Sequence, residues 1–429
     1  MIIGFFFLIA SCSTKNPGRT LDTYSDKSKR SEEIRDHKFD YRQDRLRAKE
    51  EKLSSLEPLD TQPLPSIADL TGFSDDLDRA SLEKAINNQL DAMWEQDPST
   101  PVRLGEFTLT RGRLIETLQA FLRLVQKSLP QEEFNKNVSE EFLLYRVGKG
   151  KGDDKKFLFT GYYRPIIPAS PVPTPRYRFP IYQMPGKDFQ MVKSQGSIRL
   201  VGSDSGIRQI RQSADNWRSL TRKEIDQQGA LNNQGLEVAW LENELERYFL
   251  HIQGSGVLEF PDGTRQGVRY QGSNKYSYNG IGKLMIRDGA IDTSQGSMQG
   301  IKKYFADNPQ NISKYLHQNK RYIFFTLSNE GARGSGGGEL VGGRSIATDK
   351  SIYPAGGLAF VRVRQPVLDE NDEIESWQPI SRFVVDQDTG SAIRGKARAD
   401  LYFGTGNEAG AKAGHYHERG EVYYLIKKN

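Results

Sequence analysis

From Phe157 to the C-terminus the chain consists of short runs of aromatic and β-branched residues, and this texture constrains its fold most strongly. Glycine, proline, asparagine and aspartate separate the runs, as turns separate strands. The runs read FLFTGYY, GVLEF, GVRYQ, RYIFFTL, GLAFVRVR, RFVVD and EVYYLI. We expect the interrupting helices at about residues 240–248, 297–307 and 312–318. The pattern predicts a mostly β body and argues against a doubly wound parallel sheet, which needs long strand–helix alternation.

Helices are expected before this body, beginning near Leu77. Apolar residues recur there at spacings of three and four, which places them on one helix face. They are Leu82, Ala85, Ile86, Leu90 and Met93, and then Leu114, Ile115, Leu118, Phe121, Leu122 and Val125. We assign both stripes to the core and give them no chemical role.

The N-terminus, MIIGFFFLIASC, is an apolar run that ends in Ser11 and Cys12, the single cysteine of the chain. The run is too short to span a bilayer. It resembles the lipobox of bacterial lipoproteins, which implies removal of residues 1–11 and lipid attachment to Cys12 as a membrane anchor. Ser13, directly after the cysteine, resembles the residue at this position in lipoproteins that are sent to the outer membrane. We therefore expect the chain on the periplasmic face of that membrane. The alternative is an ordinary cleavable signal, and the usual basic residues before the apolar run are absent.

Residues 12–65 are expected to form a disordered, charged tether. The segment SKRSEEIRDHKFDYRQDRLRAKEEK interleaves both signs of charge and offers little apolar surface for burial. The following LEPLDTQPLP would end any helix at its prolines.

Charge and motifs remove several function classes. The net charge of +5 comes from 60 basic and 55 acidic residues, without the long basic run of a nucleic-acid binder. GARGSGGGELVGG lacks a GK[ST] ending, and GTGNEAG lacks the Rossmann spacing. We interpret the first as a mobile loop and the second as a turn. His415 and His417 share a face without an evident third ligand, so no metal site is predicted.

The segment RFVVDQDTGSAIRGKARADLYFGTGNEAG holds the best candidate for chemistry. A strand ending at Val385 leads to Asp386 and Asp388, and the following Thr-Gly allows a turn that presents backbone N–H groups. An aspartate before Thr-Gly is also a common turn residue. A second alternative is an aspartic-type peptidase that pairs Asp388 with Asp204 of the DSG sequence. Polar residues precede both aspartates, which is atypical of that class.

Six stretches together resemble the membrane-bound lytic murein transglycosylase A family. They are FTGYYRP (159–165), YFLHIQGSGVLEFPDGT (248–264), SMQGIKKYFADNP (297–309), GRSIATDKSIYPAG (343–356), DTGSAIRG (388–395) and RADLYFGTGNEAGAKAG (398–414). The resemblance implies a double-psi β-barrel in two chain segments and a smaller inserted β-barrel, separated by a groove. We expect the main domain at residues 66–164 and 290–429, the insert at 165–289, and a three-aspartate module at about 340–428.

Within this resemblance Asp388 corresponds to the sole catalytic acid/base, with Asp400 and Asp349 as supporting residues. Asp349 is expected to shape a loop. Two positions depart from the family pattern: Ser391 stands where glycine is usual, and Lys350 stands where proline is usual. Neither change removes a carboxyl.

The resemblance implies cleavage of the β-1,4 bond between N-acetylmuramic acid and N-acetylglucosamine in peptidoglycan, with a 1,6-anhydro product. The sugar's own C6 hydroxyl attacks, so one carboxyl suffices and no metal or organic cofactor is needed. That carboxyl must be protonated near neutral pH, which requires partial burial without a nearby cation. We therefore expect Arg394 and Arg398 to point toward solvent or the glycan.

Residues expected to line the groove carry aromatic or hydrogen-bonding side chains. They are Tyr162, Tyr163, Gln253, Ser255, Arg265 and Tyr270. Tyr162 and Tyr163 alternate across a strand, so one of them is expected in a core. A glycan-binding module without catalysis remains as a third hypothesis, beside the transglycosylase and the peptidase.

Overall fold

The computed structural model describes residues 72–146 except 106, 156–201 except 187, 188, 195 and 196, and 217–429 except 330, 391 and 392. Cys12, the tether at 12–65, Asp204 and Ser391 lie outside the described residues. Among the helices that are described, none combines the length and apolar character needed to cross a bilayer.

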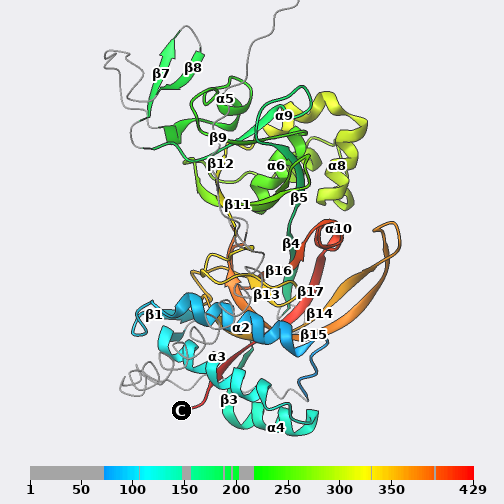
Figure 1. Ribbon diagram of the computed structural model, residues 1–429. Helices are drawn as coiled ribbons and strands as arrows, with labels where there is room; N and C mark the ends of the chain where they lie inside the picture. Colours follow the sequence, from blue (N-terminus) through cyan, green and yellow to red (C-terminus); the bar gives the residue numbers. More distant parts are fainter. Residues whose placement is uncertain are drawn as a thin grey trace, which may run out of the picture. The chain divides into compact units, whose positions relative to one another are not determined.

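The main sheet has seven strands, shown with their labels in Figure 1. They are β3 (Phe142–Arg146), β4 (Phe157–Arg164), β13 (Ser345–Ala347), β14 (Gly357–Leu368), β15 (Ile374–Asp388), β16 (Arg398–Thr405) and β17 (His417–Lys427). The sheet closes on itself because β14 pairs with both β15 and β17. The pairs β13–β15 and β16–β4 are parallel, and the other pairs are antiparallel. This closed, mixed barrel confirms the predicted mostly β fold.

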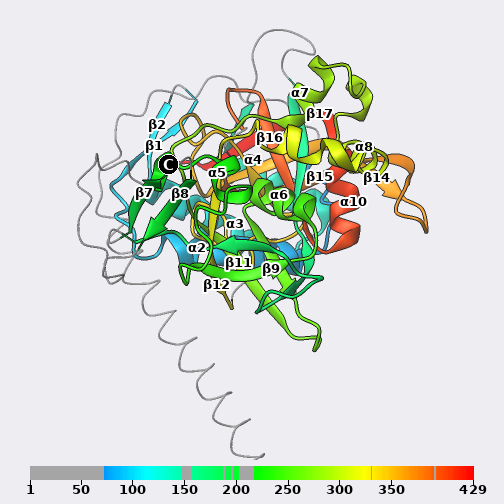
Figure 2. The same cartoon turned by 90° about the horizontal axis from the view of Figure 1, so that it is seen from above.

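Three helices pack on this barrel: α2 (Arg79–Met93), α3 (Arg111–Gln126) and α4 (Gln131–Glu141). Asp78 and Thr110 cap the first two by accepting hydrogen bonds from backbone N–H groups three residues on. The two apolar stripes are buried as predicted, apart from the half-buried Leu122. The Phe121 ring centroid lies 4.6 Å from that of Phe383, so α3 shares its core with β15. In both views the β14–β15 hairpin extends past the other strands of its sheet (Figure 1, Figure 2).

A second sheet has six strands in the order β12-β11-β10-β5-β9-β6. They are β5 (Ile166–Ser170), β6 (Phe179–Tyr182), β9 (Glu237–Leu241), β10 (Ser255–Glu259), β11 (Arg265–Ser273) and β12 (Ile323–Ser328). Its helices are α5 (Arg222–Asp226), α6 (Glu244–Gln253), α7 (Ile281–Arg287), α8 (Met298–Asp307) and α9 (Ile312–Leu316). The remaining elements are α10 (Asn407–His415), the hairpins β1 (Pro101–Leu104)–β2 (Phe107–Thr110) and β7 (Gln190–Ser194)–β8 (Ser197–Val201), and 3-10 turns at Trp217–Ser219, Thr293–Gln295 and Pro309–Asn311.

Two predicted boundaries need correction. Trp240 belongs to β9, and the helix expected from it begins later, where Asn243 caps α6 by accepting from Leu245 N at 2.7 Å. The insert was expected to end at residue 289, but β12 pairs with β11 and returns the chain to the second sheet as far as Ser328. We therefore propose residues 165–328 as the inserted segment. The helices expected at 297–307 and 312–318 match α8 and α9 closely.

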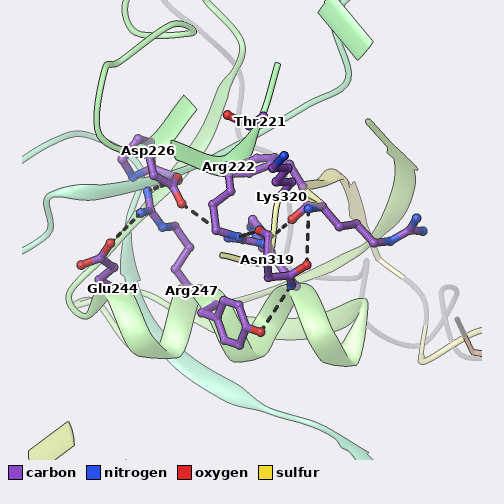
Figure 3. Close-up of polar contacts among 12 residues, drawn as sticks. Thr221, Arg222, Asp226, Glu244, Arg247, Asn319 and Lys320 are labelled. Carbon is purple, nitrogen blue, oxygen red and sulfur yellow. Dashed lines mark hydrogen bonds and ion pairs between the residues drawn. The ribbon is translucent and has the colours of Figure 1, made fainter. Parts of the chain in front are cut away.

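A buried cluster of charges lies within this inserted segment (Figure 3). The Asp226 carboxylate lies 3.4 Å from Arg222 Nη1 and 3.0 Å from Arg247 Nη1, and all three side chains are at most 4% exposed. Arg222 also donates to the Asn319 carbonyl oxygen at 3.2 Å and contacts His251 Nδ1 at 3.0 Å. Burial, and then these guanidiniums, lowers the pKa of His251 well below its ordinary value, so the ring is neutral. The cluster ties α5 to α6 and to the segment that leads into β12.

Asp226→Asn should lower the free energy of unfolding by about 3–5 kcal/mol, because it leaves two buried guanidiniums without the charge between them. Urea unfolding measures this. Asp288→Asn is the matched control, since the Arg287–Asp288 pair is at the surface, with side chains 64% and 26% exposed. That change should cost less than about 1 kcal/mol. Equal losses for the two variants would contradict the structural role of the cluster.

Candidate active site

The candidate site is built across neighbouring strands of the main barrel. Asp388 of β15 lies opposite Ala347 of β13, which lies opposite Asp400 of β16, and Asp400 lies opposite Thr160 of β4. Directly opposed residues share a face of the sheet. The small, buried Ala347 thus lies between the two aspartates in this row.

A β-bulge precedes the end of β15. Ile346 pairs with Asp386, whereas the next residue, Ala347, pairs with Asp388, so Gln387 is an extra residue. Bulges of this kind redirect side chains and are frequent next to active sites. Here Asp386 is fully buried, whereas Asp388 is half-buried and reaches the surface. The bulge thus gives two nearby carboxyls different surroundings.

The Asp388 carboxyl is held by backbone amides. Its Oδ1 accepts hydrogen bonds from Ser335 N and Thr389 N, each at 2.8 Å. Burial raises the pKa of this carboxyl above its ordinary value, and the amides, Lys350 and Tyr162 oppose the rise. A carboxyl with a raised pKa can hold a proton and release it, as a general acid must.

One of these amides comes from the glycine-rich loop, which was predicted to be mobile. Instead the loop packs on the bulge: Gly336 N donates to the Gln387 carbonyl oxygen at 2.9 Å. A Cβ added at Gly334 would lie 2.3 Å from that same oxygen. Glycine at 334 therefore permits the close approach that brings Ser335 N to Asp388.

Asp400 has a different set of partners. Its Oδ1 accepts from the Thr160 hydroxyl and lies 3.6 Å from Arg398 Nε. Arg398 also donates to Thr160 Oγ1 at 3.0 Å. Burial raises the pKa of Asp400, and Arg398 opposes the rise. Arg398 was expected to point toward solvent or the glycan; its side chain is 30% exposed and is paired with Asp400.

Arg394 differs from Arg398 in its hydrogen-bond partners. Arg394 is exposed and donates to the backbone carbonyl oxygens of Gly390 and Ile393 at 2.9 and 2.7 Å. Among the hydrogen bonds of the described residues, neither Arg394 nor Arg398 binds Asp388. A cation does act on Asp388, but it is Lys350, which the sequence interpretation did not consider for this role.

Tyr162 and Tyr402 lie beside the aspartates. They are opposed on β4 and β16, with ring centroids 5.1 Å apart. The Tyr162 hydroxyl is buried and has no hydrogen-bond partner of ordinary geometry among the described residues. Burial, and then the charge of Asp388, raises its pKa well above the ordinary value, so it stays protonated and can donate a hydrogen bond.

Asp349 links two loops. Its Oδ1 accepts from Ser351 Oγ at 2.7 Å and Ser351 N at 3.1 Å, and its Oδ2 accepts from Gly395 N at 2.8 Å. These hydrogen bonds and the charge of Arg394 lower its pKa, although burial opposes them. A carboxylate held in this way stays ionised, so Asp349 is unsuited to donate a proton.

The remaining predicted residues are dispersed. Tyr163 is buried with Ala409 and Ala413 of α10, on the other side of β4 from Tyr162, which favours packing over contact with a ligand. Gln253 Oε1 accepts from Tyr163 N at 3.3 Å. Ser255 begins β10 and is half-buried, Arg265 pairs with Glu259 at 2.7 Å, and Tyr270 is 49% exposed on β11. The structure therefore gathers Asp388, Asp400 and Tyr162, but not the whole predicted set.

Several residues of the site were given no role from the sequence: Thr160, Ser335, Lys350, Asp386 and Tyr402. Thr160 and Tyr402 lie within quoted motifs, and strand alternation from Tyr162 and Asp400 could have indicated them. Ser335 and Lys350 had no such signal, because they approach Asp388 from other segments of the chain. Across the described residues, no group of three or more histidine, cysteine, aspartate or glutamate side chains is placed to hold a metal ion.

A carboxyl whose pKa is raised lies at the end of a bulged barrel strand, an arrangement that is typical of an acid/base site. Two family models match: the MltA specific insert domain over residues 158–326 and the 3D domain over residues 344–426. A membrane-bound lytic murein transglycosylase A from Vibrio cholerae is 31% identical over 67% of this chain and 71% of its own length. The Escherichia coli K12 protein of that name is 31% identical over 62% of this chain and 65% of its own.

Solved structures of named lytic transglycosylases are also similar to this chain. A membrane-bound lytic murein transglycosylase from Agrobacterium tumefaciens has a TM-score of 0.63 and 26% identity, covering 86% of this chain and 97% of its own. The structure of E. coli MltA with bound chitohexaose has a TM-score of 0.62 and 25% identity. The match covers 87% of this chain and 97% of that structure's chain. The chain belongs to the membrane-bound lytic murein transglycosylase A family. This confirms the resemblance seen in the motifs.

Gly334→Ala should push the glycine-rich loop away from the bulge and remove the Ser335 amide from Asp388. The carboxylate then loses a donor, so the pKa of Asp388 should rise further. Carboxyl-carbon NMR titration measures this. Gly186→Ala is the control, because a Cβ there meets nothing within 4 Å. An unchanged Asp388 titration in Gly334→Ala would show that the loop does not position this amide.

Proposed function

We propose that the chain is a lytic transglycosylase that cleaves peptidoglycan glycan strands with Asp388 as its single acid/base. The observation that carries this proposal is the setting of Asp388: a desolvated carboxyl, held by two amides and free of any hydrogen-bonded guanidinium among the described residues. The named relatives support the reaction class.

The reaction needs one carboxyl because the attacking oxygen belongs to the substrate. Asp388 gives its proton to the glycosidic oxygen, and the bond from this oxygen to C1 of N-acetylmuramic acid breaks. The C6 hydroxyl oxygen then bonds to C1, and its proton passes to the Asp388 carboxylate. The products are a free C4 hydroxyl on N-acetylglucosamine and a 1,6-anhydro end, and no water is consumed. The intramolecular attack replaces the second carboxylate of ordinary glycosidases.

Asp388 suits this role better than its neighbours. Asp400 is tied to Thr160 and Arg398, and Asp349 is held as a carboxylate between two loops. We assign Asp400 a supporting role, in which it holds Arg398 against β4 and away from Asp388. The buried Tyr162 hydroxyl has spare hydrogen-bonding capacity beside Asp388, which suits contact with the sugar at the cleaved bond.

Glycan strands are the proposed substrate. A related E. coli structure was solved with bound chitohexaose, which supports binding of a sugar chain. Of the residues predicted from the sequence, Gln253, Ser255, Arg265 and Tyr270 remain proposals for more distant sugar contacts. Cell-wall turnover and remodelling follow as the biological role.

Membrane association is supported by the relatives, which are named membrane-bound. The finer proposal is that a lipid on Cys12 anchors the chain to the periplasmic face of the outer membrane, with residues 13–65 as the tether. Neither alternative function is favoured: the matched relatives are transglycosylases, and the peptidase hypothesis has no support besides the DTGS and DSG sequences.

Digestion of purified sacculi tests the function. The wild-type chain should release muropeptides with 1,6-anhydro ends, read by mass spectrometry, whereas a peptidase would cut stem peptides and a binding module would release nothing. Asp388→Asn should reduce the rate at least about 10³-fold while binding persists, since the amide cannot donate a carboxyl proton. Asp369→Asn, in the exposed β14–β15 turn, is the matched control and should keep full activity. Retained turnover in Asp388→Asn would remove this residue from its role.

The pH dependence follows from the raised pKa of Asp388. The reaction starts from the protonated carboxyl, so the rate should fall as pH rises through the pKa of this group. Because burial raises that pKa, the fall should lie above about pH 4, where an ordinary aspartate titrates. Initial rates on soluble glycan strands between pH 3 and 9 measure this, and a rate that grows steadily with pH would contradict acid catalysis by Asp388.

A further inference from the structure

Lys350 lies beside the candidate acid in a position where the family resemblance leads one to expect proline. Its ammonium donates to Thr348 Oγ1 at 3.0 Å and forms an ion pair with Asp386 Oδ1. The Lys350 side chain is only 21% exposed, and the Asp386 side chain is completely buried. A lysine this far from solvent is held by its partners and cannot rotate freely.

Asp386 is built as a fixed anion. Besides Lys350, its carboxylate accepts from Thr348 Oγ1 at 2.6 Å and from Tyr424 Oη at 2.7 Å. The Tyr424 ring is stacked on Tyr353, with centroids 5.4 Å apart and planes 9° apart. Burial raises the pKa of Asp386, and Lys350, Thr348 and Tyr424 oppose the rise. The buried carboxylate and its donors thus fix the ammonium in one place.

The segment that carries Lys350 is also bound to the backbone at Asp388. Thr348 N donates to the Asp388 carbonyl oxygen at 3.1 Å, and Thr389 Oγ1 donates to the Thr348 carbonyl oxygen at 2.8 Å. The Lys350 charge acts on the Asp388 carboxyl and opposes the effect of burial on its pKa. Geometry and charge therefore couple the ion pair to the acid.

We propose that Lys350 is a positioning residue for the reaction, whose ammonium, fixed by Asp386, stabilises the Asp388 carboxylate that remains after proton transfer to the glycan. This inference rests on the proposed function of Asp388. Burial alone would make the carboxyl too weak an acid to give up its proton readily. An unopposed cation would instead keep it ionised. Asp386 moderates the charge of Lys350, so burial still raises the pKa of Asp388 while the carboxylate formed on proton transfer is stabilised.

The expectation that no cation lies near the acid is therefore corrected by the ion pair. Other charged and titratable groups around Asp388 and Lys350 come from several elements. They are Asp349 beside Lys350, Asp386 on β15, Asp400 and Tyr402 with Arg398 on β16, Tyr162 on β4, and Tyr353 and Tyr424 around Asp386. Among the described residues, Lys350 is the cation whose charge lowers the pKa of Asp388.

The test is the pH profile of initial rates on soluble glycan strands for Lys350→Met. Loss of the positive charge disfavours the carboxylate, so the alkaline limb should move to higher pH. The maximal rate should fall by roughly tenfold, because the acid is weaker and its conjugate base less stabilised. Lys350→Arg keeps the charge and should restore the wild-type limb. An unchanged limb in folded Lys350→Met would overturn the proposal and leave a purely structural ion pair.

Two further variants complete the test. Lys350→Met leaves the Asp386 carboxylate buried without its cation, and this single variant can fail to fold. In that case the double variant Lys350→Met/Asp386→Asn is used. Its pH–rate profile should show the same shift of the alkaline limb to higher pH. Lys136→Met, whose side chain is 72% exposed on α4, is the matched lysine control and should match the wild type. If Asp388→Asn keeps its turnover, the proposed function fails. If it is inactive while both Lys350→Met variants keep the wild-type limb, only the present inference fails.

Discussion

The surroundings of the acid depend on one extra residue where β15 pairs with β13. Ile346 and Ala347 are neighbours, yet they lie opposite Asp386 and Asp388, and Gln387 bulges between these pairs. Without the bulge the two carboxyls would follow simple alternation and share similar surroundings. With it, Asp386 is enclosed with its donors while Asp388 reaches the surface. The glycine-rich loop packs on the bulge and supplies an amide, so a departure from regular pairing creates the site.

Three desolvated carboxyls lie near one end of this barrel, and their partners separate their roles. Asp386 has Lys350 and Asp400 has Arg398, so the charge of each is largely compensated. Among the described residues, Asp388 accepts hydrogen bonds from two backbone amides, and Tyr162 and the more distant charge of Lys350 also lower its pKa. Burial favours the neutral form of an acid, and pairing with a cation favours the ionised form. The carboxyl without a direct cation is thus the one best able to carry a proton to and from a substrate.

Much of the fold could be predicted because its signals are local. The helical stripes ending at Met93 and Val125 are buried as their spacing requires, and Ser297 caps α8 where that helix was expected. The errors concern sheet membership. Trp240 was predicted to begin a helix but belongs to β9. Strand β12 pairs with β11 of the second sheet, although several helices separate the two strands in the chain. Strand pairing joins residues far apart in the chain, and no local pattern specifies the partner.

The candidate site also has features that local sequence indicates and features that only the folded chain determines. The DTGS turn identified Asp388, because a carboxyl followed by small turn residues is a local feature of the chain. Its acidity, the pairing of Arg398 with Asp400, and the ion pair of Lys350 with Asp386 were decided by the folded barrel. Desolvation and charge interactions act through space, over a few ångströms, between residues that sequence order does not bring together. Amino-acid order specified which chemical groups are present, and strand pairing in three dimensions determined which of them interact.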